Sequence, residues 1–473
     1  MSALKPPTLK QKLRAIVAAS FVSRVVMFFV LPRTSSSFAP DEGSYAFLAS
    51  VSGSGELDNQ NPYYGRLFAV SRSLILPSSK LVGIGIDEFS AIRITSSIYG
   101  FLSVMAVHLF ILHLLRQHGS KQFFRNEKRI LIPFCLFAFL PSHFLWSILG
   151  LRESANEFWL MLTFLWVFLL YGEKYSNRIV LAPLITISII GTFSSRPQVG
   201  WVLVVSLLIF SLSKLRNRVT YILIISVVTG LFAGYFATTS TANVTSIVYV
   251  AKVASPTPTN EPSPTKSEKD ASKLCDESKT QVTYAGDTYD CIKAGRVTKR
   301  ERQSSLAEVS IGQIEVLPSK QVANQADAAS VIDRLACPWE EFSKIGKYAC
   351  LAFRAPYMTL TFLFRPLPFI DTTSLSSNFA AAENTLWIIM FLLVIYRIRK
   401  LKRIPFLGDL IPAIIFFSLY VIGAGSYEGN MGTAFRHKSL ILWIPLLLLF
   451  CLFSRPDAQT KKFQGNNSQE SAV

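Results

Sequence analysis

The chain has 473 residues, of which 50% are hydrophobic and only 16% are charged, and its mean hydropathy is +0.36. A soluble chain of this length is expected to fold into several domains with polar surfaces, and this composition excludes that class. The formal net charge of +18 would suit a nucleic-acid-binding protein, but the basic residues stand in short clusters between apolar runs. Such clusters are orientation signals of a membrane protein, so nucleic acid is not an expected partner.

Long apolar runs predict an all-α polytopic membrane protein, because about 20 helical residues cross the hydrocarbon core of a bilayer. We expect about ten transmembrane helices of this length. The predicted spans are 13–31, 89–115, 130–149, 157–171, 179–193, 199–213, 219–239, 384–397, 407–424 and 439–453. A cytoplasmic N-terminus places every basic cluster on the inner side. The expected location is therefore the cell membrane, with both termini cytoplasmic.

The predicted spans divide the chain into three parts. Residues 1–240 form a transmembrane core with its first external loop, 241–383 an external segment, and 384–473 the last transmembrane helices with a cytoplasmic tail. Moderately apolar pieces in the first loop predict interfacial helices that lie on the membrane surface. The external excursion begins with a Pro/Ser/Thr-rich stretch, which we expect to be partly disordered. It ends in an apolar stretch that prolines interrupt near Arg365, and we expect that stretch to be interfacial or re-entrant.

Four cysteines fall in the external segment, whereas Cys135 and Cys451 lie in apolar spans. An even number of cysteines on the oxidising side of a membrane predicts disulfides, with metal binding as the weaker alternative. Spacing does not reveal the connectivity, because four cysteines allow three pairings. The disulfide candidates are Cys275, Cys291, Cys337 and Cys350.

Charged side chains at the predicted outer ends of the spans point to a functional site. Asp41 and Glu42 follow the first span, and further charges stand in three other outer loops. Each of these charged residues has a structural interpretation when taken alone, such as a helix cap for Asp41. All of them, however, are predicted on the same side of the membrane and at the same depth, which favours one shared site. The candidates for substrate binding are Arg152, Glu153, Arg196, Glu428, Arg436, His437 and Lys438. Arg24, inside the first span, is expected instead to face the interior of the helix bundle.

Carboxylates that face basic side chains at a membrane surface suit sugar transfer from a lipid phosphate. A carboxylate can deprotonate an acceptor hydroxyl. Arginine and lysine stabilise phosphate oxygens and the charge that develops on a leaving phosphate. No cofactor is required by the sequence, a divalent cation is compatible with it, and metal ligands are not identified.

These features resemble the GT-C superfamily of polyprenyl-phosphate-sugar-dependent membrane glycosyltransferases, of bacterial type. The resemblance rests on the acidic pair, the surface helices of the first external loop and the number of spans. It covers the N-terminal spans well and the remainder only in general plan. It implies that Asp41 and Glu42 match the acidic pair of the superfamily, and Arg152 with Glu153 resembles its Arg-Glu step after the third span.

The resemblance implies a single inverting displacement. Asp41 is the preferred base, and Glu42 is its substitute or an orienting or metal-binding group. Arg152, Arg196 and Arg436 are candidates for contact with the lipid phosphate. The implied partners are a polyprenyl-phosphate-linked sugar donor, a glycan or lipid-linked acceptor, and membrane lipids. The expected role is in cell-surface glycan assembly on the extracytoplasmic face.

Two other functions remain open. A polysaccharide polymerase or ligase outside GT-C would rely on basic residues in large external loops and not on Asp41 and Glu42. A flippase or transporter of lipid-linked sugars would keep its charges near the middle of the membrane or in inverted repeats, and the sequence shows no internal repeat. The external segment has no recognisable carbohydrate-binding module, so the acceptor is open.

Overall fold

The structure of the protein is a computed structural model. It describes residues 8–31, 41–54, 67–117, 127–172, 175–244, 281–284, 287–292, 296–299, 344–367, 375–400, 407–427 and 431–453. The chain forms two compact units, of which Met1–Tyr249 and Leu317–Val473 make up the larger and Val250–Val316 the smaller. Among the described residues, helices build the larger unit and strands build the smaller one.

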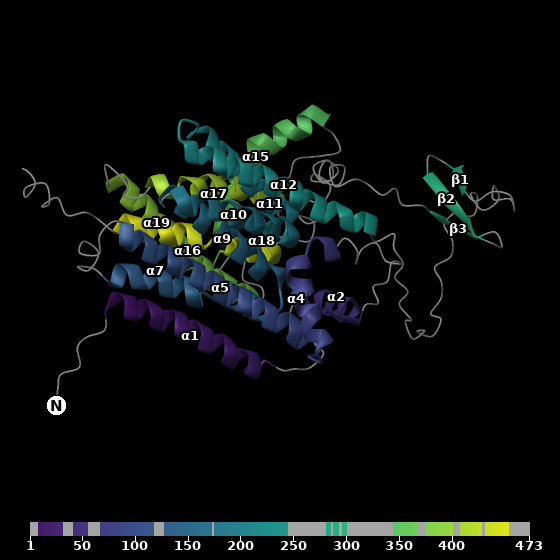
Figure 1. The fold of residues 1–473 in the computed structure, drawn as a ribbon, viewed down its shortest axis with the longest axis horizontal. Helices are drawn as coiled ribbons and strands as arrows, with labels where there is room; N and C mark the ends of the chain where they lie inside the picture. Colours follow the sequence, from purple (N-terminus) through teal and green to yellow (C-terminus); the bar gives the residue numbers. More distant parts are fainter. Residues whose placement is uncertain are drawn as a thin grey trace, which may run out of the picture. The chain divides into compact units, whose positions relative to one another are not determined.

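The helices of the larger unit range from the 8 residues of α8 to the 30 residues of α5. In chain order they are α1 (Leu9–Val30), α2 (Glu42–Ser54), α4 (Arg72–Gly83), α5 (Glu88–Gln117), α7 (Lys128–Phe139), α8 (Pro141–Ile148), α9 (Arg152–Gly172), α10 (Tyr175–Ser195), α11 (Pro197–Leu212), α12 (Arg218–Val244), α15 (Lys344–Phe364), α16 (Leu375–Lys400), α17 (Leu407–Tyr427), α18 (Met431–Ser439) and α19 (Trp443–Phe453). Figure 1 labels most of them, and shows α1, α5 and α7 running side by side.

Eight segments of the described chain are long and apolar enough to cross a membrane. They are Leu9–Val30, Glu88–Arg116, Ile130–Ile148, Arg152–Gly172, Arg178–Ser195, Arg218–Tyr235, Asn378–Arg399 and Ala434–Leu452. Two shorter apolar helices, Pro197–Leu212 and Leu410–Gly425, coincide with the remaining predicted spans. The predicted all-α polytopic membrane fold is therefore confirmed, and each predicted span has a helix. The orientation of the termini stays a prediction.

Two of these segments contain a break that the hydropathy did not indicate. Ile130–Ile148 comprises α7 and α8, which meet at Leu140, where the backbone is extended (φ −60°, ψ 132°). The second helix begins at Pro141, because proline lacks the N–H that a helix interior needs but fits the first helical position. Ala434–Leu452 likewise comprises α18 and α19. The first break, at Leu140, lies three residues before the buried His143.

The apolar stretch before Arg365 forms α15, which ends at Phe364. The position of Pro366 explains this end, because proline disfavours the helical conformation in the residue before it, here Arg365. The helix packs along α17 and also contacts α16 and α18. In the described chain α15 is not one of the segments that meet the length and composition of a membrane span. An interfacial or re-entrant position for this stretch stays a prediction.

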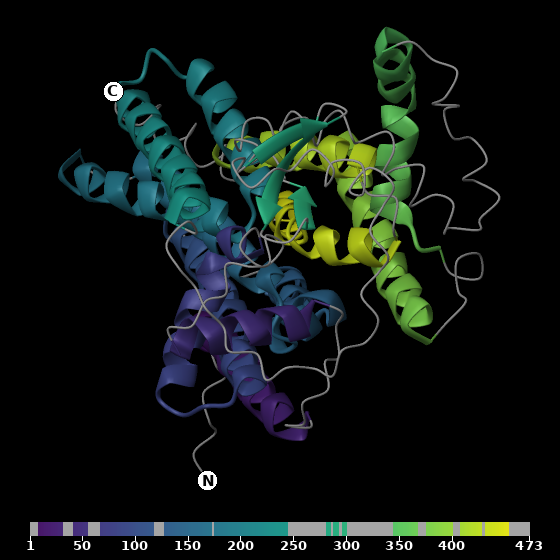
Figure 2. The same ribbon diagram turned by 90° about the vertical axis from the view of Figure 1, so that its right-hand side faces the viewer.

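The loop that is predicted to be the first external one contains α2 and α4, which pack on each other and on α5. Tyr45, Leu48 and Ala49 are all buried, and their spacing places them on one face of α2. With Leu74 and Ile75 of α4 they belong to a small apolar core separate from the main core. Figure 1 shows α2 and α4 together at one end of the long helices, and Figure 2 views the molecule from that side. This core holds the acidic pair at the start of α2 in place.

The smaller unit contains a three-stranded antiparallel sheet in the order β1 (Gln281–Tyr284), β2 (Asp287–Ile292) and β3 (Arg296–Lys299). Tyr284 pairs with Asp287, and Ile292 with Arg296, so short turns join the strands. The sequence predicts a small external excursion here, and strands are not among its expected elements. Cys275 and Cys337 lie outside the described residues, as do the side chains of Cys291 and Cys350. The disulfides therefore stay a prediction.

Candidate functional site

The acidic pair is divided between two environments. Asp41 is 44% exposed, and its Oδ2 accepts a 2.8 Å hydrogen bond from Nη1 of Arg436. Glu42 is fully buried, and its Oε1 accepts a 2.6 Å hydrogen bond from Nε of Arg93 on α5. Successive residues of a helix point about 100° apart, so neighbours at its start can face solvent and core respectively. Asp41 can therefore meet a ligand, whereas Glu42 is closed off.

Arg436 reaches Asp41 from α18, a 9-residue helix near the other end of the chain. This helix packs against α8 and α9, which brings it to the end of the bundle where α9 begins. The guanidinium is 15% exposed, so it is largely desolvated but still reachable. Basic residues in the last turn of a helix also interact favourably with the helix dipole. A contact between segments 395 residues apart thus completes the predicted outer site.

Arg152 and Glu153 are the first residues of α9, which begins two residues after Gly150, where φ is +66°. Glycine adopts this left-handed conformation without the strain that other residues meet, and it lets the chain turn from α8 into α9. Arg152 donates weakly from Nη1 to the carbonyl oxygen of Val70 (3.3 Å) and Oγ of Ser71 (3.4 Å). These long bonds leave the guanidinium with capacity for a stronger partner.

Arg196 comes from the turn between α10 and α11. It is the N-cap residue of α11, and its Nη1 lies 3.8 Å from Oε1 of Glu153. Glu153 also interacts electrostatically with Arg152 and Arg436. The structure therefore brings together five of the predicted site residues. We call this set the acid–arginine cluster, and it consists of Asp41, Arg152, Glu153, Arg196 and Arg436.

Several atoms of the acid–arginine cluster are buried without a hydrogen-bond partner. They are Nε of Arg152, Oε2 of Glu153 and Nη1 of Arg196. Buried polar groups are normally paired, so this concentration marks a place for water or a ligand. The cluster contains three guanidiniums and two carboxylates, which leaves one positive charge in excess. An anion such as a phosphate would be attracted to it.

Tyr45 on α2 lies beside this cluster and is 1% exposed. Burial raises the pKa of Tyr45 to about 12, while the positive charge of Arg152 acts in the opposite direction. The phenol therefore stays protonated at physiological pH and can act as a hydrogen-bond donor.

Lys438 is placed differently from Arg436. Its side chain is 1% exposed, and its ammonium donates to the carbonyl oxygens of Leu363 and Arg365 and, across 2.7 Å, to Oδ1 of Asn384. An ammonium has three N–H groups, so these acceptors use all of them. Lys438 thus ties α18 to the end of α15 and to α16. We leave it out of the proposed substrate contacts.

The remaining predicted residues are His437 and Glu428. His437 is 5% exposed and interacts electrostatically with Arg196 and Glu153, so it borders the acid–arginine cluster from inside the protein. Its backbone carbonyl accepts a 3.3 Å hydrogen bond from the hydroxyl of Tyr420. Glu428 lies outside the described residues.

A second polar group lies deeper and includes the predicted interior residue Arg24. Nη2 of Arg24 lies 3.0 Å from Nε2 of His143, and Nδ1 of His143 lies 2.8 Å from Oε2 of Glu157. Because a guanidinium can only donate, Nε2 is the acceptor and Nδ1 carries the proton that Glu157 accepts. Nε of Arg24 also donates to Oγ of Ser147 across 3.1 Å. The chain Arg24–His143–Glu157 joins α1, α8 and α9 and confirms that Arg24 faces the interior.

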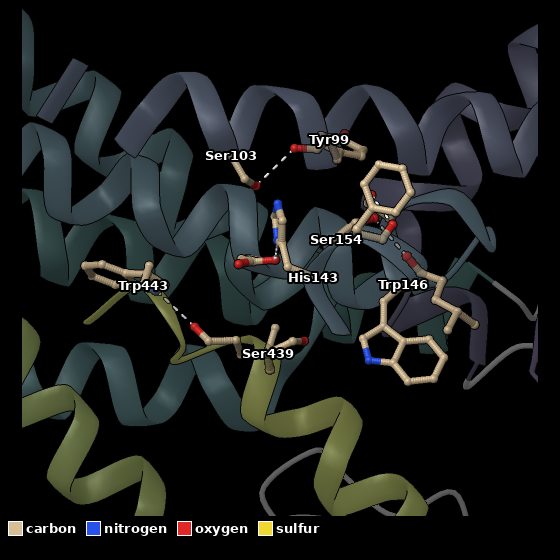
Figure 3. A network of polar contacts seen from close by, with 12 residues as sticks. Tyr99, Ser103, His143, Trp146, Ser154, Ser439 and Trp443 are labelled. Carbon is tan, nitrogen blue, oxygen red and sulfur yellow. Dashed lines mark hydrogen bonds and ion pairs between the residues drawn. The ribbon is translucent and has the colours of Figure 1, made fainter. Parts of the chain in front are cut away.

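Figure 3 shows His143 between the α5 residues Tyr99 and Ser103 and the α18 residue Ser439. In the same view the ring of Trp146 extends away from His143. That ring lies 6.4 Å from Phe435 in an edge-to-face arrangement, next in sequence to Arg436. Trp146 and Phe435 therefore form an aromatic pair between α8 and α18, the helix that also carries Arg436.

Sequence reasoning missed Arg93 and His143. Both stand in predicted spans, and a charged residue inside an apolar run is the signal that could have identified Arg93. Among the residues that the structure describes, no three His, Cys, Asp or Glu side chains gather as metal ligands would. Comparison with known proteins found no matching family model, no similar curated protein and no similar solved structure.

Proposed function

We propose that the protein is a GT-C-type membrane glycosyltransferase. It would transfer a sugar from a polyprenyl-phosphate donor to an acceptor hydroxyl on the extracytoplasmic face, in cell-surface glycan assembly. The observation that carries the proposal is the accessible carboxylate of Asp41 held by Arg436 beside further guanidiniums. This arrangement lies at one end of helices that have the length and composition to cross a membrane.

The proposed chemistry divides the acidic pair. Asp41 takes the proton from the acceptor hydroxyl, because its carboxylate is accessible and held in place. The acceptor oxygen then bonds to the anomeric carbon while the bond from that carbon to the phosphate oxygen breaks, so the electron pair leaves with the lipid phosphate. Attack from the side opposite to the leaving group inverts the anomeric configuration. Glu42 has a supporting role, since Arg93 engages it inside the protein.

The arginines of the acid–arginine cluster would hold the donor. Arg152, Arg196 and Arg436 can donate to the phosphate oxygens, and atoms of the first two lack partners inside the protein. Their charges would stabilise the phosphate more strongly as it becomes the leaving group, which lowers the barrier. Trp146 and Phe435 offer an apolar surface beside them, on which a sugar or prenyl group could pack.

The flippase alternative draws on the Arg24–His143–Glu157 chain, because buried charges within a membrane often mark a transport path. Here these side chains bind one another, and Arg24 is 2% exposed. These contacts between side chains of three helices favour a structural role. The polymerase or ligase alternative predicts that the acidic pair is dispensable, which the following experiment tests.

The test is a transfer assay with purified protein in lipid nanodiscs, a set of polyprenyl-phosphate sugars and a cell-envelope glycan extract as acceptor. Asp41→Asn should lower release of polyprenyl phosphate by about 10²–10⁴-fold, as expected for loss of a general base. Asp87→Asn is the matched control, because Asp87 only caps α5 through a 2.8 Å bond to the Ser90 N–H and asparagine can do the same. Equal activity of the wild type and Asp41→Asn would reject the proposal.

A further inference from the structure

A hollow lies at the other end of the bundle, far from the acid–arginine cluster. α9 begins in that cluster at Arg152, and its 21 residues extend over about 30 Å. At its far end the hydroxyl of Tyr171 lies 3.2 Å from Oγ1 of Thr220, near the start of α12. The turn between α11 and α12 is therefore at the end that the sequence analysis places on the cytoplasmic side.

Basic side chains line this hollow, which has a volume of about 920 Å³ and is open on one side. Its described lining residues are Arg178 of α10, together with Arg216, Asn217, Arg218 and Val219 of the α11–α12 turn. Among these described residues three are arginines and none is acidic, so the described lining carries an excess of positive charge. Like charges held together in this way repel one another, and an anion between them would remove the repulsion.

The contacts of the arginines support a ligand of opposite charge. Nε of Arg178 is buried and has no hydrogen-bond partner. Arg216 and Arg218 are exposed, and within the described chain no ion pair involves either of them. Planar guanidiniums bind phosphate in a bidentate manner, which makes phosphate the anion that fits this lining best.

Hydrogen bonds hold the α11–α12 turn, which lines the hollow, in place without a ligand. Oδ1 of Asn217 accepts a 3.1 Å bond from the N–H of Val219, which caps the start of α12. Oγ1 of Thr220 donates across 2.8 Å to the carbonyl oxygen of Lys214 and so closes the turn. A site that is already ordered loses little entropy on binding.

Exposed apolar side chains next to the arginines indicate the source of the phosphate. Ile179 and Val180 follow Arg178 and are 60% and 63% exposed. Tyr221 and Ile225 follow Arg218 on α12 and are 56% and 65% exposed. A cationic hollow bordered by an apolar helix surface matches an amphiphile whose head is anionic and whose chains lie along the helices. A soluble phosphate compound would not use that surface.

We propose that this hollow binds the headgroup phosphate of an anionic phospholipid in the cytoplasmic leaflet. The guanidiniums of Arg178, Arg216 and Arg218 contact the phosphate, and the acyl chains pack on the exposed surfaces of α10 and α12. The site is independent of the sugar-transfer proposal, because it lies at the opposite end of the bundle.

The test measures lipid retention on the purified protein by native mass spectrometry, after reconstitution in mixed phosphatidylcholine and phosphatidylglycerol bilayers. We expect the wild type to retain phosphatidylglycerol selectively. The double variant Arg216→Ala/Arg218→Ala should lower that retention at least about tenfold, since both arginines face an anionic headgroup. These side chains are exposed, so the folded structure should not change.

Lys214→Ala is the matched control, because Lys214 is an exposed cation of the same turn that does not line the hollow. It should retain the lipid as the wild type does. Equal losses in the control and the double variant would mean only diffuse attraction to a charged surface and would overturn the proposal. Displacement of phosphatidylglycerol by millimolar inorganic phosphate would also overturn it, by showing that a soluble anion is the ligand.

Discussion

Arg93 and Glu42 form an ion pair inside the protein, with Nε and Oε1 2.6 Å apart and with side chains that are 3% and 0% exposed. The pair fastens the first residue of α2 to the first turns of α5. Asp41 precedes it and points to the accessible side, where Arg436 holds it. The acidic pair thus combines one residue that anchors the surface helix with one that a substrate can reach. In the proposed mechanism only the accessible carboxylate of Asp41 acts as the base, and Glu42 holds the helix that carries it.

Arg93→Ala should lower the stability of the protein by about 3–5 kcal/mol, because it leaves a carboxylate buried without its main partner. We expect a lower midpoint of thermal unfolding in detergent. Arg93→Ala/Glu42→Gln should recover part of the loss, since the neutral amide costs less to bury. Asp41→Asn, at an exposed position, should unfold near the wild-type temperature. An unchanged midpoint for Arg93→Ala would show that the ion pair does not fasten α2.

Arg436→Ala should weaken use of the donor, because it removes a cation from the leaving phosphate and also frees Asp41. The measurement is initial rate against donor concentration, with loss expected in both KM and kcat. Arg436→Lys keeps the positive charge but replaces the planar guanidinium with an ammonium. Activity should be lost if Arg436 binds the phosphate through two hydrogen bonds, and retained if only its charge matters. Lys80→Ala is the control, because Lys80 is an exposed cation of α4 outside the acid–arginine cluster. Wild-type kinetics for Arg436→Ala would remove it from the site.

Gly150→Ala should destabilise the start of α9 for two reasons. The backbone has φ +66°, and an added Cβ would lie 2.8 Å from the side chain of Ile92. Gly85→Ala separates these effects, because Gly85 has φ +93° but nothing lies within 4 Å of its added Cβ. Gly85→Ala should lower the free energy of unfolding by about 1–2 kcal/mol, because alanine is strained in this left-handed backbone conformation. We expect Gly150→Ala to lose more free energy of unfolding than Gly85→Ala, and Ile92→Ala to restore part of that loss. Equal losses for the two glycine variants would mean that α5 and the start of α9 do not pack closely there.

Labelling with a membrane-impermeant maleimide tests the orientation of the bundle. Asp87→Cys, before α5, should react in intact cells, whereas Lys214→Cys, between α11 and α12, should react only after permeabilisation. The physical reason is the excess of basic residues in loops that stay on the cytoplasmic side. The unmodified chain gives the background from its own cysteines. Labelling of both sites from the same side would contradict the predicted topology and place the two proposed sites on one surface.

Hydropathy was sufficient to predict the membrane-spanning segments, and charge was sufficient to predict that residues of several loops come together. These signals are local, because apolar runs set the spans and each loop carries its own charge. Charge also singled out Asp41 and Arg436, although nothing in the sequence shows that the two side chains touch. Pairings such as Arg93 with Glu42 depend on how helices pack, and a single sequence contains no record of that packing.

The lack of packing information in a single sequence also explains where the structure differs from the predictions. Lys438 stands only two residues after Arg436, yet its ammonium binds acceptors at the end of α15 and on Asn384 inside the protein. His143 follows the break between α7 and α8, which hydropathy does not detect because both helices are apolar. The strands of the smaller unit are four to six residues long. In such short stretches the alternation of apolar and polar residues that indicates a strand is not recognisable.

A structure of the purified protein with a non-transferable polyprenyl-phosphate sugar analogue tests the proposed function most sharply. We expect density for the phosphate within hydrogen-bond distance of at least two of the guanidiniums of Arg152, Arg196 and Arg436. The anomeric carbon should lie toward the carboxylate of Asp41, with room for an acceptor hydroxyl between them. A phosphate bound elsewhere, with the acid–arginine cluster empty of donor, would contradict the proposed function.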